Sequence, residues 1–144
     1  VAAINAKRYN AEIEFVMGDY LDPFYNISSS PVAIPVMKGV PPYFDIIVSN
    51  PPYVSEADYS KLEPELKHEP KHALTGFPYE HIKKQSQSLL QEHGFLAFEF
   101  GQGQRLSLEK IFPGASFYKD LENNDRMLIW SEPQPETILG FKPL

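Results

Sequence analysis

The sequence predicts an α/β fold in which a mostly parallel sheet is closed by an antiparallel element at one edge. Predicted strands and helices alternate along most of the chain, and two short strands joined by a polar turn follow near its end. Polar residues stand at the carboxyl ends of three predicted strands, at Asp19, Asn50 and Glu99. Because ligands bind beyond the carboxyl ends of strands in such sheets, we expect a site there.

The first half of the chain combines one helix, two strands and two loops. Residues 1–9 have the pattern of the second half of an amphipathic helix, and the alternation of apolar and polar residues at 13–19 predicts a strand. Residues 20–43 hold five prolines and three successive serines, so we interpret this long stretch as a mobile insertion rather than a functional loop. The apolar run at 44–50 predicts a strand buried on both faces, and residues 54–78 predict a second polar loop.

The second half predicts two helices and three strands. Apolar residues at helical spacing indicate a helix over 79–93, which Gly94 ends, and the following apolar run predicts a strand over 94–101. A second helix is expected over 104–112, before a proline and a glycine. Strands are then expected at 115–121 and 126–130, joined in a hairpin by the short polar side chains between them.

Composition excludes several classes of protein. The 144 residues include 13 Lys and Arg against 19 Asp and Glu, a net charge of −6, and 42% are hydrophobic, which indicates one folded domain at most. The acidic balance disfavours sequence-independent nucleic-acid binding but leaves a localised contact open. There is no cysteine, and the four histidines lack the spacing of a zinc site. No apolar run is long enough for a membrane span and no signal peptide is evident, so we expect no membrane partner and a location in the cytoplasm or an organelle matrix.

The segment Asn50-Pro51-Pro52-Tyr53 is the sharpest chemical signal. Two successive prolines fix φ near −65° and remove two N–H donors, so the backbone leaves the strand with its carbonyls in an imposed direction. The Asn50 side-chain oxygen and the Pro51 carbonyl are placed to accept the two N–H groups of a substrate amide or amine, while the Tyr53 ring covers its planar face. The alternative is a plain turn that ends a strand.

The string Asp45-Ile46-Ile47-Val48-Ser49-Asn50-Pro51-Pro52-Tyr53-Val54 resembles the catalytic motif of S-adenosylmethionine-dependent amino methyltransferases. The wider chain, from about residue 1 to 130, resembles the release-factor glutamine methyltransferases (the HemK/PrmC family). The segments that carry this closer resemblance are Gly18-Asp19, Glu69-Pro70 with Ala73-Leu74, Phe98-Glu99-Phe100-Gly101 with Gln104, and Asp120 with Asp125-Arg126. The resemblance implies a Rossmann-like class I methyltransferase sheet.

Individual roles follow from the resemblance. Asn50 and the Pro51 carbonyl are implied to bind the glutamine amide of a peptide-chain release factor, with Pro52 in the catalytic motif and Tyr53 packed against the amide. The resemblance assigns Asp19, together with Asn50, to the cofactor S-adenosyl-L-methionine, with Asp19 on its adenine amino group. Glu69 is placed on the substrate side, where a plain solvated glutamate is an equal alternative, and Glu99 and Arg126 are expected to be structural.

The chain departs from the family pattern at its beginning. The family's Gly-rich first motif, the acidic residue that ends its second strand and its amino-terminal helical domain are all missing, and Gly101-Gln102-Gly103 is no substitute. We therefore expect a fragment that lacks the first strands of the sheet and has unpaired strand edges and reduced stability. Its partner is then expected to be the missing amino-terminal part of the same enzyme.

The sequence predicts one partial domain followed by a tail, and it leaves two alternative functions open. Residues 1–130 are interpreted as a partial catalytic domain and 131–144 as a Pro-rich tail. Beside glutamine methylation, the alternatives are an adenine N(6)-methyltransferase acting on a flipped base and an inactive fragment or interaction module that has lost cofactor binding.

Overall fold

A computed structural model describes residues 1–25 and 44–132, and the chain divides between Pro42 and Tyr43 into two units. The expected insertion falls mainly on residues 26–43, and most of the expected tail on 133–144; both ranges lie outside the described residues. Each unit is considered by itself.

The first unit holds two short helices. Helix α1, Ala2–Arg8, confirms the expected helix, and α2 spans Asp22–Tyr25. The strand expected at 13–19 is not present, so this prediction was wrong: residues 11–17 have no regular structure and the chain turns at 18–21. A strand requires a neighbouring strand to pair its backbone N–H and C=O groups, and none of the described residues forms a strand pairing with this segment.

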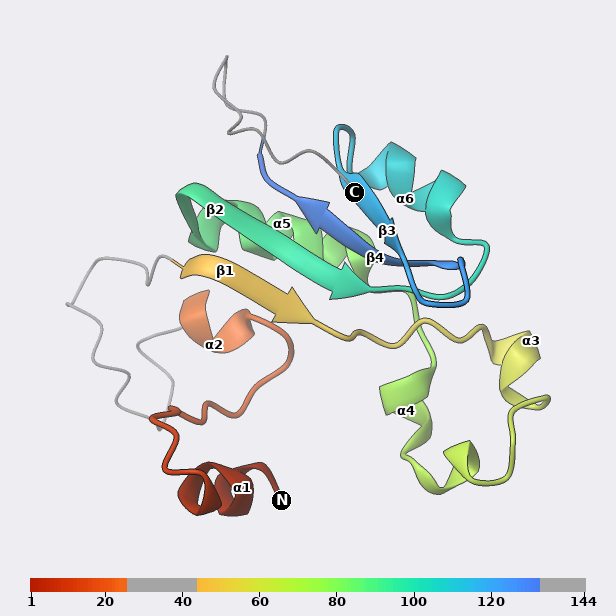
Figure 1. Cartoon of the computed structure of the whole chain (residues 1–144), viewed down its shortest axis with the longest axis horizontal. Helices are drawn as coiled ribbons and strands as arrows, with labels where there is room; N and C mark the ends of the chain where they lie inside the picture. The colour runs from red at the N-terminus through yellow and green to blue at the C-terminus, as the bar shows by residue number, and fades with distance from the viewer. Residues whose placement is uncertain (26–43, 133–144) are drawn as a thin grey trace. The chain divides into compact units, whose positions relative to one another are not determined.

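The second unit is built on a four-stranded sheet with the order β1-β2-β4-β3. Strand β1, Phe44–Ser49, runs parallel to β2, Leu90–Glu99. Strands β3, Ser116–Lys119, and β4, Asp125–Trp130, form an antiparallel hairpin that joins the sheet through β4 against β2. These pairings confirm the α/β class, the parallel pair and the antiparallel closing hairpin (Figure 1).

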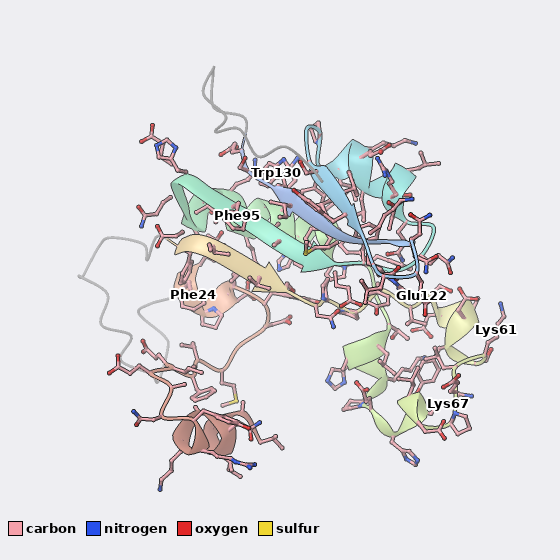
Figure 2. All side chains as sticks on the ribbon, in the orientation of Figure 1. Phe24, Lys61, Lys67, Phe95, Glu122 and Trp130 are labelled. Atoms are coloured by element: carbon pink, nitrogen blue, oxygen red, sulfur yellow. The ribbon has the colours of Figure 1, made fainter. Side chains whose placement is uncertain are left out.

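The core lies between the sheet and two helices, α5, Tyr79–Leu89, and α6, Arg105–Ile111. The Phe98 ring of β2 is 5.3 Å from the ring of Tyr79 and 5.2 Å from that of Phe112, which in turn lies 5.6 Å from Trp130. Figure 2 shows Trp130 on β4, where its side chain is only 2% exposed. This row of aromatic contacts attaches both helices to the central strands.

Two boundaries and one burial pattern differ from expectation. Helix α5 ends at Leu89 rather than at residue 93, because Leu90 is extended and starts β2. Gly94 lies where the β1–β2 register shifts, and a Cβ there would stand 2.7 Å from the Phe44 carbonyl oxygen. The prediction that β1 is buried on both faces was wrong: Ile47 is buried, but Ile46 and Val48 are 51% and 76% exposed, because the helices cover one face of the sheet.

The loop expected at 54–78 contains short helical turns. These are α3, Glu56–Tyr59, the 3-10 helix η1, Leu66–His68, and α4, Lys71–Leu74. The charged side chains of this loop, among them Lys61 and Lys67 in Figure 2, are exposed.

Candidate active site

A turn of imposed shape follows β1. The strand ends at Ser49, and the chain continues through Asn50, Pro51, Pro52 and Tyr53 before it pairs again at Val54. The Val54 N–H donates to the Leu74 carbonyl at 2.9 Å, and Val54 forms an isolated bridge with Thr75. The two prolines fix two φ angles, and β1 and the Val54–Thr75 bridge hold the two ends of the turn. The conformation of the turn is therefore restricted.

Tyr53 is held at both its backbone and its ring. Its hydroxyl donates to Glu99 Oε1 at 3.0 Å, and its carbonyl accepts from Gln104 Nε2 at 2.9 Å. Burial, followed by the hydrogen bond to Glu99, raises the pKa of the Tyr53 phenol, so the group is protonated at neutral pH. The ring orientation is therefore fixed by β2.

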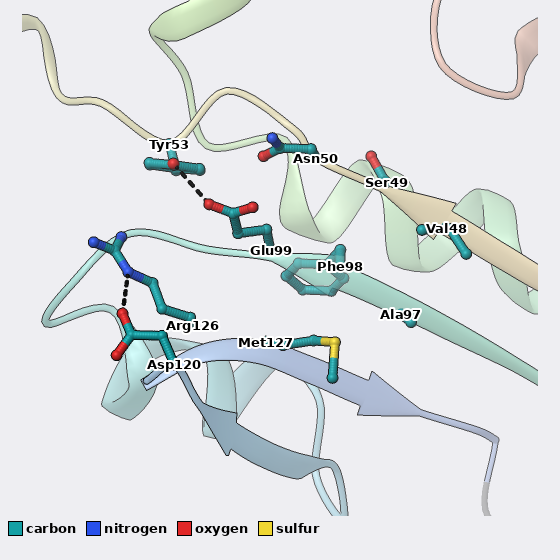
Figure 3. A pocket seen from close by; sticks show the side chains of 10 residues that line it. All are labelled: Val48, Ser49, Asn50, Tyr53, Ala97, Phe98, Glu99, Asp120, Arg126 and Met127. Carbon is teal, nitrogen blue, oxygen red and sulfur yellow. Dashed lines mark hydrogen bonds and ion pairs between the residues drawn. The ribbon is translucent and has the colours of Figure 1, made fainter. Parts of the chain in front are cut away.

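A pocket of about 600 Å³ opens beside this turn (Figure 3). Its walls come from the end of β1 with the turn that follows it, the end of β2 and the turn end of the β3–β4 hairpin. The lining residues are Val48, Ser49, Asn50, Tyr53, Ala97, Phe98, Glu99, Asp120, Arg126 and Met127. The pocket thus lies at the carboxyl ends of the parallel strands, where the sequence predicted a site.

The two acceptors expected to bind an amide differ in their exposure. Among the described residues, neither the Asn50 side chain nor the Pro51 carbonyl takes part in a hydrogen bond; Asn50 is exposed and lines the pocket, whereas Pro51 is buried and does not line it. Figure 3 shows Asn50 and Glu99 facing the same space. Two carbonyl oxygens with no protein donor are suited to the two N–H groups of a primary amide.

Three charged side chains line the pocket. Arg126 Nε lies 3.3 Å from Asp120 Oδ2, and Glu99 is occupied on one oxygen by Tyr53. The Asn124 backbone N–H, followed by Arg126, holds the pKa of Asp120 below its usual range. Two carboxylates against one guanidinium leave a net negative charge, which suits a cationic ligand such as a sulfonium.

The structure brings together only part of the predicted set. Asn50 and Tyr53 line the pocket and Pro51 and Pro52 form the turn beside it, whereas Glu69 is exposed after η1 and does not line the pocket. Asp19 belongs to the first unit, where its carbonyl accepts from the Asp22 N–H in the turn before α2. The roles assigned to all of these residues remain predictions.

Sequence reasoning missed Gln104 and Tyr79 as residues of this site. Their side chains meet where the turn after β1 crosses the turn after β2: the Tyr79 hydroxyl donates to Gln104 Oε1 at 2.6 Å. The sequence signal for Gln104 was its place in the segment with Phe98-Glu99-Phe100-Gly101 that carries the family resemblance, to which no role was assigned; Tyr79 stood only at the expected start of a helix.

Over 1–25 and 44–132, no group of three or more His, Cys, Asp or Glu side chains is arranged to hold a metal ion. None of the helices in these ranges is long and apolar enough to cross a membrane.

Comparison with known proteins identifies relatives. The chain is 36% identical over 140 residues to a release factor glutamine methyltransferase of Bacillus anthracis. The matched region covers 89% of this chain and 45% of the relative. It is 32% identical to the release factor glutamine methyltransferase of Bacillus subtilis, over 89% of this chain and 44% of the relative. It is 31% identical to that of Enterococcus faecalis, over 90% of this chain and 46% of the relative. No protein-family model matches. The chain thus spans slightly less than half the length of these curated relatives.

Proposed function

We propose, from the homology of this chain to the carboxyl-terminal part of the release factor glutamine methyltransferases, that it carries the amide-binding turn of a protein-glutamine methyltransferase. The substrate is the side-chain amide nitrogen of a glutamine in a peptide-chain release factor. The methyl donor is S-adenosyl-L-methionine, which supplies a methyl group on a cationic sulfonium. The adenine-methyltransferase alternative has no support from these relatives, so we do not propose it.

One observation carries the proposal: at the carboxyl end of β1, two carbonyl oxygens, of Asn50 and Pro51, accept no hydrogen bond from any residue in the described ranges, and two prolines restrict the backbone of their segment. An amide nitrogen is a poor nucleophile because its lone pair is delocalised into the carbonyl. When both its hydrogens are held by strong acceptors, the nitrogen is fixed in orientation and its nucleophilic geometry is favoured.

The reaction is a single methyl transfer. A bond forms between the amide nitrogen and the methyl carbon as the bond from that carbon to sulfur breaks, and its electron pair stays on the sulfur. The nitrogen then loses one proton to water, so no general base is required at the outset. In this step Asn50 and Pro51 orient the amide, and the Tyr53 ring, anchored on Glu99, covers its face.

The remaining pocket fits the charge of the methyl donor. Glu99 and Asp120 give the pocket a net negative charge in spite of Arg126, and Val48, Ala97 and Met127 supply apolar surface. We also expect Asn50 to contact S-adenosyl-L-methionine. Asp19 is expected to accept a hydrogen bond from the adenine amino group of this methyl donor.

Methyl transfer from labelled S-adenosyl-L-methionine to a release factor tests the proposal. We expect the wild-type chain to label a glutamine, and Asn50→Ala to lower the rate about 100-fold, the magnitude typical of one lost oriented group. Gln91→Ala is the matched control, because this exposed carboxamide lies at the opposite end of β2 and its loss should leave the rate unchanged. The proposal would be overturned by an undiminished rate in Asn50→Ala, or by no transfer with the wild-type chain.

A further inference from the structure

The carboxamide of Gln104 joins three segments of the second unit. Its Nε2 donates to the Tyr53 carbonyl at 2.9 Å, and its Oε1 accepts from the Gly101 N–H at 2.9 Å and from the Tyr79 hydroxyl at 2.6 Å. These partners belong to the turn after β1, the turn after β2 and the start of α5. The bonds occupy both lone pairs of the oxygen and one of the two amide hydrogens.

The side chain of Gln104 does not serve its own helix. The residue stands at the N-cap of α6, yet its side chain makes no capping hydrogen bond. Glutamine is also not among the residues favoured at this position, which are Ser, Thr, Asp and Asn. The role of the side chain therefore lies in the contacts that it makes outside α6.

The turn after β1 depends on such an outside donor. Pro51 and Pro52 have no N–H, so this part of the turn cannot be held by donating hydrogen bonds from its own backbone. Its attachments are instead the Tyr53 carbonyl on Gln104, the Tyr53 hydroxyl on Glu99, and Val54 on residues 74–76. Of these, the bond from Gln104 is the one to the backbone of the turn itself.

Packing reinforces this bond. A Cβ on Gly101 would lie 3.0 Å from Tyr53 Cδ2 and 3.2 Å from the Gln104 carboxamide. The Tyr53 ring, the Gly101 backbone and Gln104 are therefore in close contact, and a shift of one displaces the others.

We propose that Gln104 is a positioning residue that holds the Asn50–Tyr53 turn in the geometry that binds the substrate amide. That the turn binds an amide rests on the proposed function; that Gln104 immobilises the turn does not. Without the carboxamide the Tyr53 carbonyl loses its donor, the turn becomes mobile and the two acceptors of Asn50 and Pro51 are no longer fixed relative to each other.

Gln104→Glu provides a test with a distinct signature. It keeps the shape and an acceptor for Gly101 and Tyr79, but a carboxylate cannot donate to the Tyr53 carbonyl, and a carboxylic acid can. The titratable groups near this position are the Tyr79 phenol, which burial keeps protonated, Glu99 through Tyr53, and Arg105, which is paired with Glu109 and Asp125. We expect the defect of the variant to be relieved as the pH falls from 8.5 to 5.5, because two carbonyl-type oxygens in contact favour the protonated acid.

The primary measurement is backbone ¹⁵N relaxation of the full 144-residue chain. We expect the order parameter of Tyr53 to fall from about 0.85 to below about 0.6 in Gln104→Ala, and in Gln104→Glu at pH 8.5 with recovery at lower pH. Gln102→Glu is the matched control in the same turn, since Gln102 is exposed and its side chain donates to Asn124 Oδ1, away from Tyr53; it should change Tyr53 at neither pH. An unchanged Tyr53 in Gln104→Ala, or a pH-independent effect in Gln104→Glu, would overturn the inference. If Gln104→Ala does not fold, the isosteric Gln104→Glu decides alone.

Binding of N-acetyl-glutamine methylamide, measured on the same samples, separates the two proposals. We expect Gln104→Ala to bind this probe about tenfold more weakly than the wild type, and Gln104→Glu to regain affinity as the pH falls. If the wild type binds the probe and both Gln104 variants bind it equally well, the inference fails and the proposed function stands. If the wild type does not bind it while Tyr53 responds as predicted, Gln104 holds the turn and the proposed amide site fails.

Discussion

Gly101→Ala tests whether close packing behind Tyr53 maintains the site without removing any hydrogen-bonding group. Gly101 has no positive φ, so alanine is compatible with the backbone there. Its Cβ would nevertheless lie 3.0 Å from Tyr53 Cδ2 and 3.2 Å from Gln104 Cδ and Nε2, closer than ordinary van der Waals contact. The Tyr53 ring or the Gln104 carboxamide must therefore move by a few tenths of an ångström.

The expected loss of stability is modest. Overpacking a well-filled site costs about 1–3 kcal/mol, and we expect about 1 kcal/mol here because both neighbours are side chains rather than backbone. Weakening the hydrogen bond from Tyr53 to Glu99 adds about 1 kcal/mol. Urea unfolding should thus give a free energy of unfolding lowered by about 2 kcal/mol.

Gly114→Ala is the matched control. Gly114 has φ +80°, and a Cβ added there would meet no heavy atom within 4 Å, so alanine introduces backbone strain of about 1–2 kcal/mol and no contact. The two variants should lose similar stability, but only Gly101→Ala should weaken binding of N-acetyl-glutamine methylamide, by about tenfold. Equal affinities in the two variants would refute the reasoning that the packing behind Tyr53 positions the turn.

Three further predictions concern stability. Phe98→Ala removes the ring that links α5 to the segment after α6 and should lower the free energy of unfolding by about 3–5 kcal/mol, which urea titration measures against Phe77→Ala, an exposed ring. Burial raises the pKa of Tyr79, so the native state keeps this proton at a pH where the unfolded chain has lost it. The free energy of unfolding should therefore fall as the pH rises above about 10, and less steeply in Tyr79→Phe than in the wild type. Parallel curves of unfolding free energy against pH for the two proteins would contradict this. The pKa of Asp120 is lowered by the Asn124 N–H, so its contribution is present above about pH 4 and lost on acidification; thermal melts of Asp120→Ala should depend less on pH between 5 and 2 than those of the wild type.

The elements that were predictable are those whose signals are local. The run before Asn50 ends at two prolines, so the end of β1 could be located within one residue. The hairpin was equally accessible: Asp120 Oδ1 accepts from the N–H groups of Glu122 and Asn124, and Asn123 takes a φ of +68° that asparagine tolerates.

The failures concern pairing between distant segments. Alternation at 13–19 is a strand signal, but a strand also requires a partner, and the sequence pattern cannot supply one. In the same way, the apolar run of β1 indicated burial but not which faces are covered, since that depends on where α5 and α6 pack.

The candidate site was predictable in its acceptors but not in its support. Asn50 and Tyr53 were visible because the prolines between them restrict the backbone. Gln104 lies 51 residues beyond Tyr53, and only the fold shows that its carboxamide, held by the Tyr79 hydroxyl, reaches the Tyr53 carbonyl.

The most direct test of the account is the amide selectivity of the Asn50–Tyr53 turn. The ¹⁵N-labelled chain is titrated with N-acetyl-glutamine methylamide and, in parallel, with N-acetyl-glutamate methylamide, which has a carboxylate in place of the amide and no N–H to donate there. We expect saturable shifts at Asn50, Tyr53 and Glu99 with the glutamine probe and at least tenfold weaker binding of the glutamate probe. Equal affinity for the two probes, or shifts that leave Asn50 and Tyr53 unchanged, would contradict it.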